Sequence, residues 1–133
     1  MLFRSFASLP TALQDYFDGF HHGDVAALRR IFHPQCHLYC ATDGKLADDD
    51  METVYARVAG RASPASNKEP RHDLILSIDR SSPVSAFVKL QISIGARLYT
   101  DYLSLLRIDG KWRIISKTYA YAALPAPAKM AAE

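Results

Sequence analysis

The chain has 133 residues, of which 49% are hydrophobic and 23% are charged, and its formal net charge is +2. This length suits one globular domain that buries roughly two-thirds of its unfolded surface. The small net charge and the scattered basic residues argue against nucleic-acid binding, and no apolar stretch reaches the roughly 20 residues of a membrane-spanning helix. We therefore expect a soluble protein that acts on neither nucleic acid nor membranes.

The first part of the sequence predicts three helices. In the first, apolar residues recur at three- and four-residue spacings: Leu9, Leu13, Tyr16, Phe17 and Phe20. Gly23 suits the end of this helix, and Asp24 suits the N-cap of a second helix that Pro34 cannot continue. The acidic run Asp48–Asp50 suits the start of a third helix, which should end near Gly60.

The rest of the chain is predicted to be mainly strands. A short strand should lie between the second and third helices, from Cys36 to Thr42. After residue 71 the hydrophobic period becomes two in four segments: His72–Arg80, Val84–Ile94, Arg97–Asp109 and Lys111–Tyr121. We expect one domain over residues 1–121 and a frayed tail over residues 122–133, because the tail is rich in Ala and Pro.

Two features indicate a cytoplasmic protein. Cys36 and Cys40 lie four residues apart in a predicted strand. Extended chain separates them by roughly 13 Å, whereas a disulfide needs Cα atoms within about 7 Å. Two free thiols fit a reducing compartment, and the segment Met1–Phe6 lacks the continuous apolar stretch of a secretory signal.

The predicted hairpin turns fix a strand register. The dipeptides Asp109-Gly110 and Gly95-Ala96 favour tight turns, and a loop of odd length at Ser81–Pro83 joins the first two long strands. The resulting expected pairs are Leu105 with Ile114, Leu103 with Ser116, Asp101 with Thr118, Leu90 with Asp101, Val88 with Leu103, Leu74 with Leu90 and Leu76 with Val88.

This register separates two faces of the sheet. The face that the helices should cover holds Leu74, Leu76, Ile78, Ala86, Val88, Leu90, Ile92, Leu103, Leu105, Trp112 and Ile114. The other face holds Phe87, Lys89, Gln91, Thr100, Tyr102, Ser104, Lys117, Tyr119 and Tyr121. Because aromatic, amphipathic surfaces suit protein interfaces, we expect a homodimer through Phe87, Tyr102, Lys117 and Tyr119.

The candidate site is a polar group at one end of the covered face. A buried carboxylate at Asp101 is costly unless it has partners or a function, so Asp101 is our candidate catalytic acid or base. The equally weighted alternative is a hydrogen-bonded carboxylate that closes the core. Further candidate ligand-binding residues are Tyr16, Cys40, Tyr55, His72, Tyr99, Ser116 and Thr118. For Tyr16, Tyr55 and Cys40, plain packing is the alternative.

Neither a metal nor a cofactor is expected. The five histidines include the adjacent pair His21 and His22, which point in different directions, and the pair His33 and His37, which Pro34 separates from a common helix. HExxH, CxxC, GxSxG, P-loop and GxGxxG motifs are all absent from the sequence.

The order helix–helix–strand–helix followed by four strands resembles the nuclear transport factor 2-like superfamily, which includes SnoaL-like cyclases and ketosteroid isomerases. The resemblance covers residues 12–121 and is closest to its lumazine-binding branch. The segments that carry it are Tyr16–Phe20, Gly23-Asp24, Phe32–Pro34, Asp101–Leu105 and Asp109–Lys117. It implies a cone-shaped α+β (cystatin-like) fold with a pocket between helices and concave sheet, and a dimer through the convex face.

The resemblance does not deliver an activity, because this fold carries enzymes, binding modules and adaptors. Ketosteroid isomerases use an inward tyrosine, an aspartate base on the first strand and an inward acid on a later strand. Tyr16 and Asp101 are similar in place to the first and third, but Tyr39 or Cys40 stands at the base position, which argues against that isomerisation.

We expect the pocket to bind a small apolar or aromatic molecule, with Asp101 as the acid or base if a reaction follows. Tyr16, Tyr55 and His72 would orient the ligand. The alternative is a non-catalytic dimeric interaction module with a vestigial pocket. A cone filled by side chains would contradict the first interpretation.

Overall fold

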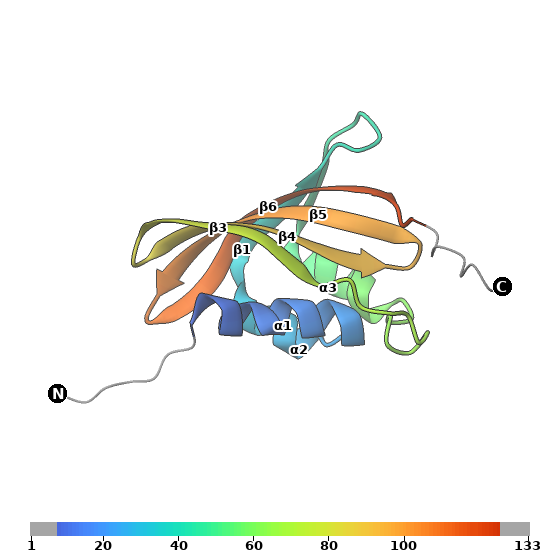
Figure 1. Cartoon of the computed structure of the whole chain (residues 1–133), viewed down its shortest axis with the longest axis horizontal. Coiled ribbons are helices and arrows are strands. Elements are labelled where there is room, and N and C mark those ends of the chain that lie inside the picture. The colour runs from blue at the N-terminus through green and yellow to red at the C-terminus, as the bar shows by residue number, and fades with distance from the viewer. Residues whose placement is uncertain (1–7, 126–133) are drawn as a thin grey trace, which may run out of the picture.

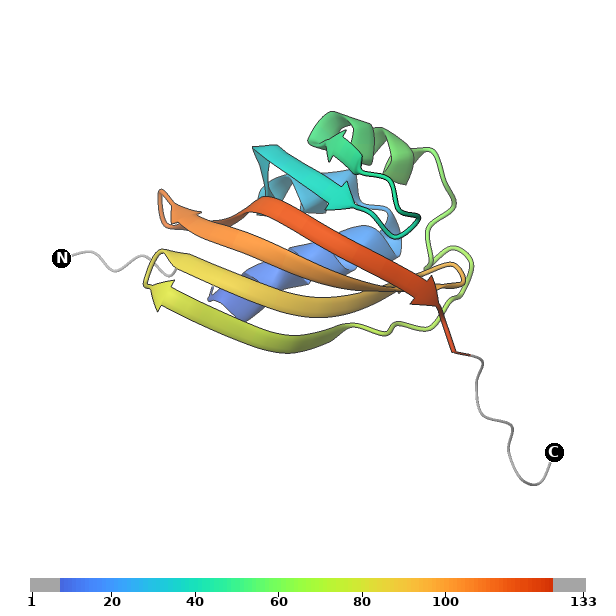
Figure 2. The same ribbon diagram turned by 90° about the horizontal axis from the view of Figure 1, so that it is seen from above.

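The structure, a computed structural model, describes residues 8–125 as three helices and six strands. The helices are α1 (Leu9–His22), α2 (Val25–Ile31) and α3 (Met51–Ala59), and the strands are β1 (Phe32–Cys40), β2 (Ala47–Asp50), β3 (Leu74–Ser82), β4 (Ser85–Ile94), β5 (Arg97–Ile108) and β6 (Lys111–Ala123). The sheet order is β2-β1-β6-β5-β4-β3. The helices lie on one side of this curved sheet (Figures 1 and 2), which confirms the predicted α+β fold.

The predicted helix boundaries are confirmed by the caps. The N-cap of α1 is Ser8, and Gly23 ends the helix in the left-handed region with φ 65°. Asp24 caps α2, and the carboxylate of Asp50 accepts a hydrogen bond of 2.9 Å from the backbone N–H of Thr53 at the start of α3. Each side chain satisfies a backbone donor that the first helical turn leaves free.

The sequence did not reveal β2, and it did not show that the sheet is mixed. The segment Ala47–Asp50 forms an antiparallel edge strand beside β1, whereas β1 runs parallel to β6. Three of the four residues in β2 are aspartates, which are rare in strands, so the pattern indicated only a helix cap. An edge position tolerates them because one side of β2 faces solvent.

The tight hairpin turns are confirmed. Asp109 and Gly110 adopt φ values of 51° and 78° between the paired residues Ile108 and Lys111, as a turn with two positive φ angles requires. Across the preceding hairpin, Asp101 lies opposite Leu90, as predicted.

A bulge in β6 changes the predicted faces. Leu105 pairs with Ile114 but Ser104 pairs with Ser116, so Ile115 is an extra residue in β6. A one-residue shift moves every later side chain to the opposite face.

Asp101 therefore lies opposite Tyr119, and the prediction that it pairs with Thr118 is wrong. The predicted inward placement of Ser116 and Thr118 is also wrong. So is the predicted dimer-face placement of Lys117, Tyr119 and Tyr121, which turn toward the helices and line a cavity there.

The register between β3 and β4 also differs from the expected one. Ser82 pairs with Ser85, so the prediction of an odd-length loop at Ser81–Pro83 is wrong, and a register shift lies between Arg80 and Ser82. Ile75 pairs with Leu90, and Ile78 pairs with Val88, with a shift between Ile75 and Ser77. The expected pairs of Leu74 with Leu90 and Leu76 with Val88 are therefore wrong. Leu74 and Leu76, expected in the core, are 50% and 44% exposed.

Helices and sheet enclose one continuous apolar core, whose largest fully buried side chains include Leu9, Leu13, Leu28, Ile31, Phe32, Leu90, Leu103, Leu105 and Ile114. Cys36 and Cys40 are buried free thiols, as predicted. No helix in residues 8–125 is long and apolar enough to cross a membrane. The expectations for Met1–Phe6 and for residues 126–133 fall outside the described residues, whereas Ala122 and Ala123 still belong to β6.

Candidate functional site

Three polar side chains from three elements meet inside the core. Tyr16 of α1 donates a hydrogen bond from its hydroxyl to Oδ2 of Asp101 on β5. Nζ of Lys117 on β6 lies 3.4 Å from the same oxygen. Tyr16 and Asp101 are 0% exposed and Lys117 is 3% exposed. Within residues 8–125, Oδ1 of Asp101 has no hydrogen-bond partner. We call these three residues the buried triad.

Local sequence explains how the triad forms. Tyr16 belongs to the apolar stripe of α1, so its ring packs in the core and its hydroxyl reaches the sheet. The Ile115 bulge turns Lys117 to the same face. There Nζ lies 4.8 Å from the ring centre of Phe20 and 5.1 Å from those of Tyr16 and Tyr119. Aromatic faces attract a cation and partly replace lost hydration.

Burial perturbs the protonation of the triad. Desolvation lowers the pKa of Lys117 below its ordinary value of 10.5, although Asp101 opposes this shift. The nearby guanidinium of Arg61 lowers this pKa further. Desolvation and the charge of Asp101 raise the pKa of Tyr16 well above 10.0. Lys117 therefore loses its proton more readily than an exposed lysine, while Tyr16 stays a hydrogen-bond donor.

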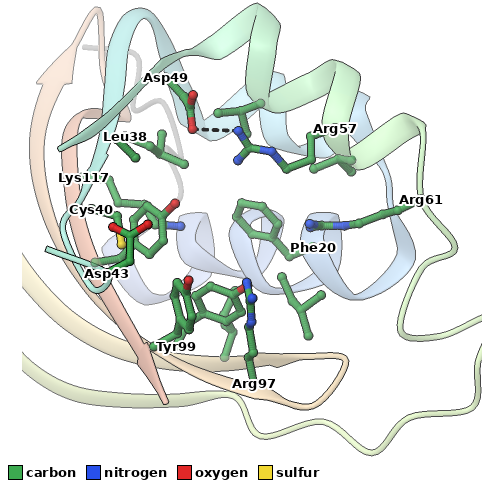
Figure 3. A pocket seen from close by; sticks show the side chains of 17 residues that line it. Phe20, Leu38, Cys40, Asp43, Asp49, Arg57, Arg61, Arg97, Tyr99 and Lys117 are labelled. Atoms are coloured by element: carbon green, nitrogen blue, oxygen red, sulfur yellow. Dashed lines mark hydrogen bonds and ion pairs between the residues drawn. The ribbon is translucent and has the colours of Figure 1, made fainter. Parts of the chain in front are cut away.

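A cavity of about 290 Å³ adjoins the triad between α3 and the concave face of the sheet (Figure 3). Lys117 lines this cavity, whereas Asp101 and Tyr16 lie behind it. Its aromatic lining consists of Phe20, Tyr99, Tyr119 and Tyr121. The cone is therefore not filled by side chains, and the volume lies near the lower end, about 300 Å³, of small-molecule sites.

The cavity carries more basic than acidic side chains: Arg57, Arg61, Arg97 and Lys117 against Asp43 and Asp49. Arg57 and Asp49 form an ion pair of 2.7 Å, and the guanidinium of Arg97 covers the ring of Tyr121 at 4.1 Å.

Arg61, just after α3, points into the cavity in Figure 3. It is half-buried and has no ion pair among residues 8–125. Desolvation lowers the pKa of this guanidinium. A half-buried arginine without an acidic partner favours an incoming anion.

The structure brings together four of the predicted site residues. Asp101 and Tyr16 are in direct contact. Cys40 and Tyr99 line the cavity, and Sγ of Cys40 donates to the hydroxyl of Thr42 at 3.4 Å. These four residues therefore lie in or directly behind one cavity.

The other four predicted residues lie elsewhere. Tyr55 packs in the core with the guanidinium of Arg29 4.3 Å from its ring centre, and it does not line the cavity. His72 is exposed, with Nδ1 2.8 Å from Oγ of Ser93. Ser116 and Thr118 face away because of the bulge.

Sequence reasoning missed the basic lining and two tyrosines: Arg57, Arg61, Arg97, Lys117, Tyr119 and Tyr121. Two signals were present in the chain. Arg57 and Arg61 lie close together around the helix end that Gly60 predicts. Ile114 and Ile115 are adjacent apolar residues in an alternating strand, where a phase change occurs.

No group of three or more His, Cys, Asp or Glu side chains in residues 8–125 is arranged to hold a metal ion.

Comparison with known proteins assigns the family. The model of the family described as "putative lumazine-binding" matches residues 5–120, so the chain belongs to this family. Solved structures share the fold. A nuclear transport factor 2-like protein of unknown function from Silicibacter pomeroyi is 23% identical, with a TM-score of 0.76 over 86% of this chain and 92% of that one. A similar protein from Shewanella baltica is also 23% identical, with a TM-score of 0.74 over 86% of this chain and 90% of that one.

One curated relative carries the name of an enzyme. The chain is 27% identical over 106 residues to "Aldolase FrzH" from a Cladobotryum species, covering 78% of this chain and 81% of that protein.

Proposed function

We propose that this protein is an acid–base enzyme that binds a small anionic carbonyl compound in the cavity and activates the carbon next to its carbonyl group. Lys117 contacts the reacting carbonyl group of the substrate. Asp101 exchanges a proton with Lys117, and Tyr16 orients the carboxylate of Asp101. This substrate class differs from the small apolar or aromatic ligand expected from the sequence, because the cavity lining includes three arginines.

The observation that carries this proposal is the buried triad at the wall of the cavity. A lysine whose pKa is lowered by burial, 3.4 Å from a buried carboxylate, can both donate and accept a proton. As a donor, Lys117 stabilises negative charge on a carbonyl oxygen. As an acceptor, it removes a proton from the adjacent carbon. The aldolase name of a relative supports this reaction class, since an aldol reaction proceeds through such a carbon.

The lining supports the choice of substrate. Arg61 favours a carboxylate or another compact anion. The rings of Tyr99, Tyr119 and Phe20 offer an apolar wall for an aromatic or aliphatic group. A volume of about 290 Å³ suits a molecule of roughly one ring with a short side chain.

We also propose a homodimer through the convex face of the sheet. The rings of Phe87 and Tyr102 stack there with centres 5.7 Å apart, and they are 44% and 39% exposed. Leu106, which is 42% exposed, extends this apolar surface. The alternative of a non-catalytic interaction module shares this dimer but assigns no role to the cavity and its arginines.

Phenylpyruvate is a suitable probe, because it combines a carboxylate, an aromatic ring and a carbonyl with exchangeable protons on the next carbon. Proton NMR in heavy water follows this exchange. The wild-type protein should accelerate the exchange in a saturable manner. Arg61→Gln should raise the half-saturating concentration by about tenfold or more, because a charged hydrogen bond contributes about 1.5–3 kcal/mol.

The matched control is Arg80→Gln. Arg80 is an exposed arginine whose guanidinium lies 5.4 Å from the ring centre of Trp112, and it does not line the cavity. This variant should behave like wild type. If wild-type protein does not accelerate the exchange above buffer, the proposed function is wrong.

A further inference from the structure

Building on the proposed function, we propose that Lys117 bonds covalently to the substrate, its amine condensing with the carbonyl group to form an imine. Lys117 would then be a nucleophile as well as a proton carrier. The covalent bond to the substrate would form at Nζ of Lys117, in the wall of the cavity.

The position of Lys117 sets it apart from the other described lysines. It is 3% exposed and lines the cavity. Lys45, Lys68 and Lys111 are exposed, and Lys89 lies on the opposite face of the sheet, opposite Tyr102. A substrate anchored by Arg61 in the same cavity brings its carbonyl group to an amine that aromatic rings hold in place. Such positioning replaces a bimolecular encounter by an intramolecular one.

The neighbours of Lys117 suit proton exchange. Oδ2 of Asp101 lies 3.4 Å from Nζ, close enough to take a proton with a small movement. Tyr16 donates to that oxygen and orients the carboxylate. The side chain of Asp101 is fully buried, so a proton that it holds is not exposed to bulk water.

The atoms and charges of the step balance. The ammonium group of Lys117 passes one proton to Asp101, and the lone pair of the amine attacks the carbonyl carbon. The carbonyl oxygen takes a proton from the nitrogen, then a second one that Asp101 returns, and leaves as water. The net change converts one ammonium group and one carbonyl compound into one protonated imine and one water. Its positive nitrogen withdraws electrons from the bonds of the adjacent carbon, as an aldol reaction requires.

Desolvation, with a smaller contribution from the charge of Arg61, favours the amine form of Lys117. Burial is the largest effect on the pKa of Lys117 and lowers it, and the positive charge of Arg61 lowers it further. Asp101 and the Cys36 thiol on β1 raise this pKa and so oppose the shift. Tyr16 and Tyr119 also face Nζ, and burial raises the pKa of both, to about 12 for Tyr119. Both phenols are therefore neutral at pH 7–8 and add no negative charge. Lys117 is accordingly neutral more often than an exposed lysine.

Hydride trapping tests the proposal. Wild-type protein is incubated with phenylpyruvate and sodium cyanoborohydride at pH 7.5, and the intact mass is measured. One imine reduced to an amine adds the mass of the probe minus one oxygen atom. Digestion and tandem mass spectrometry should place this addition on Lys117, at least tenfold above any other lysine. Because the mapping uses wild-type protein, it does not depend on a variant that folds.

The variants provide controls for the site. Lys111→Met changes an exposed lysine on the same strand and should label like wild type, whereas Lys117→Arg should lose the adduct. Acceleration of proton exchange without an adduct on Lys117 would overturn the imine and leave the proposed function standing. An adduct on Lys117 without exchange would support the imine and overturn the proposed acid–base function. Labelling spread evenly over the lysines, or neither exchange nor an adduct, would overturn the imine.

Discussion

Tyr16 and Asp101 are 85 residues apart in the sequence, yet the hydroxyl of one donates to the carboxylate of the other where neither is exposed to solvent. This contact joins α1 to β5 through the centre of the fold. It also occupies the oxygen of Asp101 that lies near Lys117. One buried carboxylate therefore links the helices to the wall of the cavity.

Tyr16→Phe should destabilise the protein by about 1–3 kcal/mol, because it removes the described hydrogen-bond donor of a buried carboxylate while keeping the aromatic ring. The melting temperature should fall by several degrees. Tyr55→Phe is the matched control, since Tyr55 is also buried on a helix but contacts Arg29 through its ring. Calorimetry of both variants measures the difference. Equal melting temperatures would show that the Tyr16–Asp101 contact does not stabilise the fold.

Asp101→Asn should lower the free energy of unfolding by about 3 kcal/mol, because it leaves the buried Lys117 without its carboxylate. Adding Lys117→Met to this variant should recover at least about 1 kcal/mol, since the double variant buries no unpaired charge. Urea unfolding of the wild type, Asp101→Asn, Lys117→Met and the double variant gives the coupling free energy. Additive losses would show that the two side chains do not interact.

The sequence predicted the fold well and the site only in part, and Ile115 explains much of the difference. Hairpin turns and alternation predicted how the four long strands pair, and the expected pair of Leu105 with Ile114 was right. Alternation cannot reveal where a strand gains one residue, and beyond that point each side chain was assigned to the wrong face. Lys117 was therefore placed on the dimer face, and Asp101 received the catalytic role on its own.

The arginines were missed for a different reason. Charged residues near the end of an amphipathic helix ordinarily face solvent, so those of the third helix were not assigned to the pocket. Arg57 and Arg61 lie over a cavity because the concave sheet curves away from the end of α3, which depends on long-range packing. Tyr16 and Asp101 were found because both are polar groups on faces predicted to be buried, and that signal is local.

Tyr102→Glu should convert the proposed homodimer into monomers. Tyr102 stacks on Phe87 on the exposed convex face and lies opposite Lys89, so a glutamate there would remove aromatic surface from the two-fold interface and bury a charged pair in it. Ala56→Glu is the control, because Ala56 is exposed on α3, away from this face. Size-exclusion chromatography with light scattering measures both masses. A wild-type protein that is monomeric at micromolar concentration would refute the dimer.

The stability of the protein should rise with pH because of Lys117. Burial lowers the pKa of Lys117 in the folded chain, whereas in the unfolded chain this pKa stays near 10.5. Between these two values the unfolded state binds more protons, so the free energy of unfolding increases with pH throughout that window. At pH values below the pKa of Lys117 in the folded protein, the lysine is charged in both states, and the full cost of burying its charge lowers the stability of the fold.

The Asp101→Asn/Lys117→Met variant lacks this titration, so its free energy of unfolding should increase less between pH 7 and pH 9 than that of the wild type. The thiol of Cys36, whose pKa burial raises from 9.0 to about 12, destabilises the folded state above pH 9. The comparison therefore stops at pH 9, where the phenol of Tyr16 is also still protonated in both states. Urea unfolding at half-unit pH intervals measures the two curves. Parallel curves would show that the pKa of Lys117 is not lowered into this pH range in the folded protein, and the lysine would then be a less effective nucleophile at neutral pH.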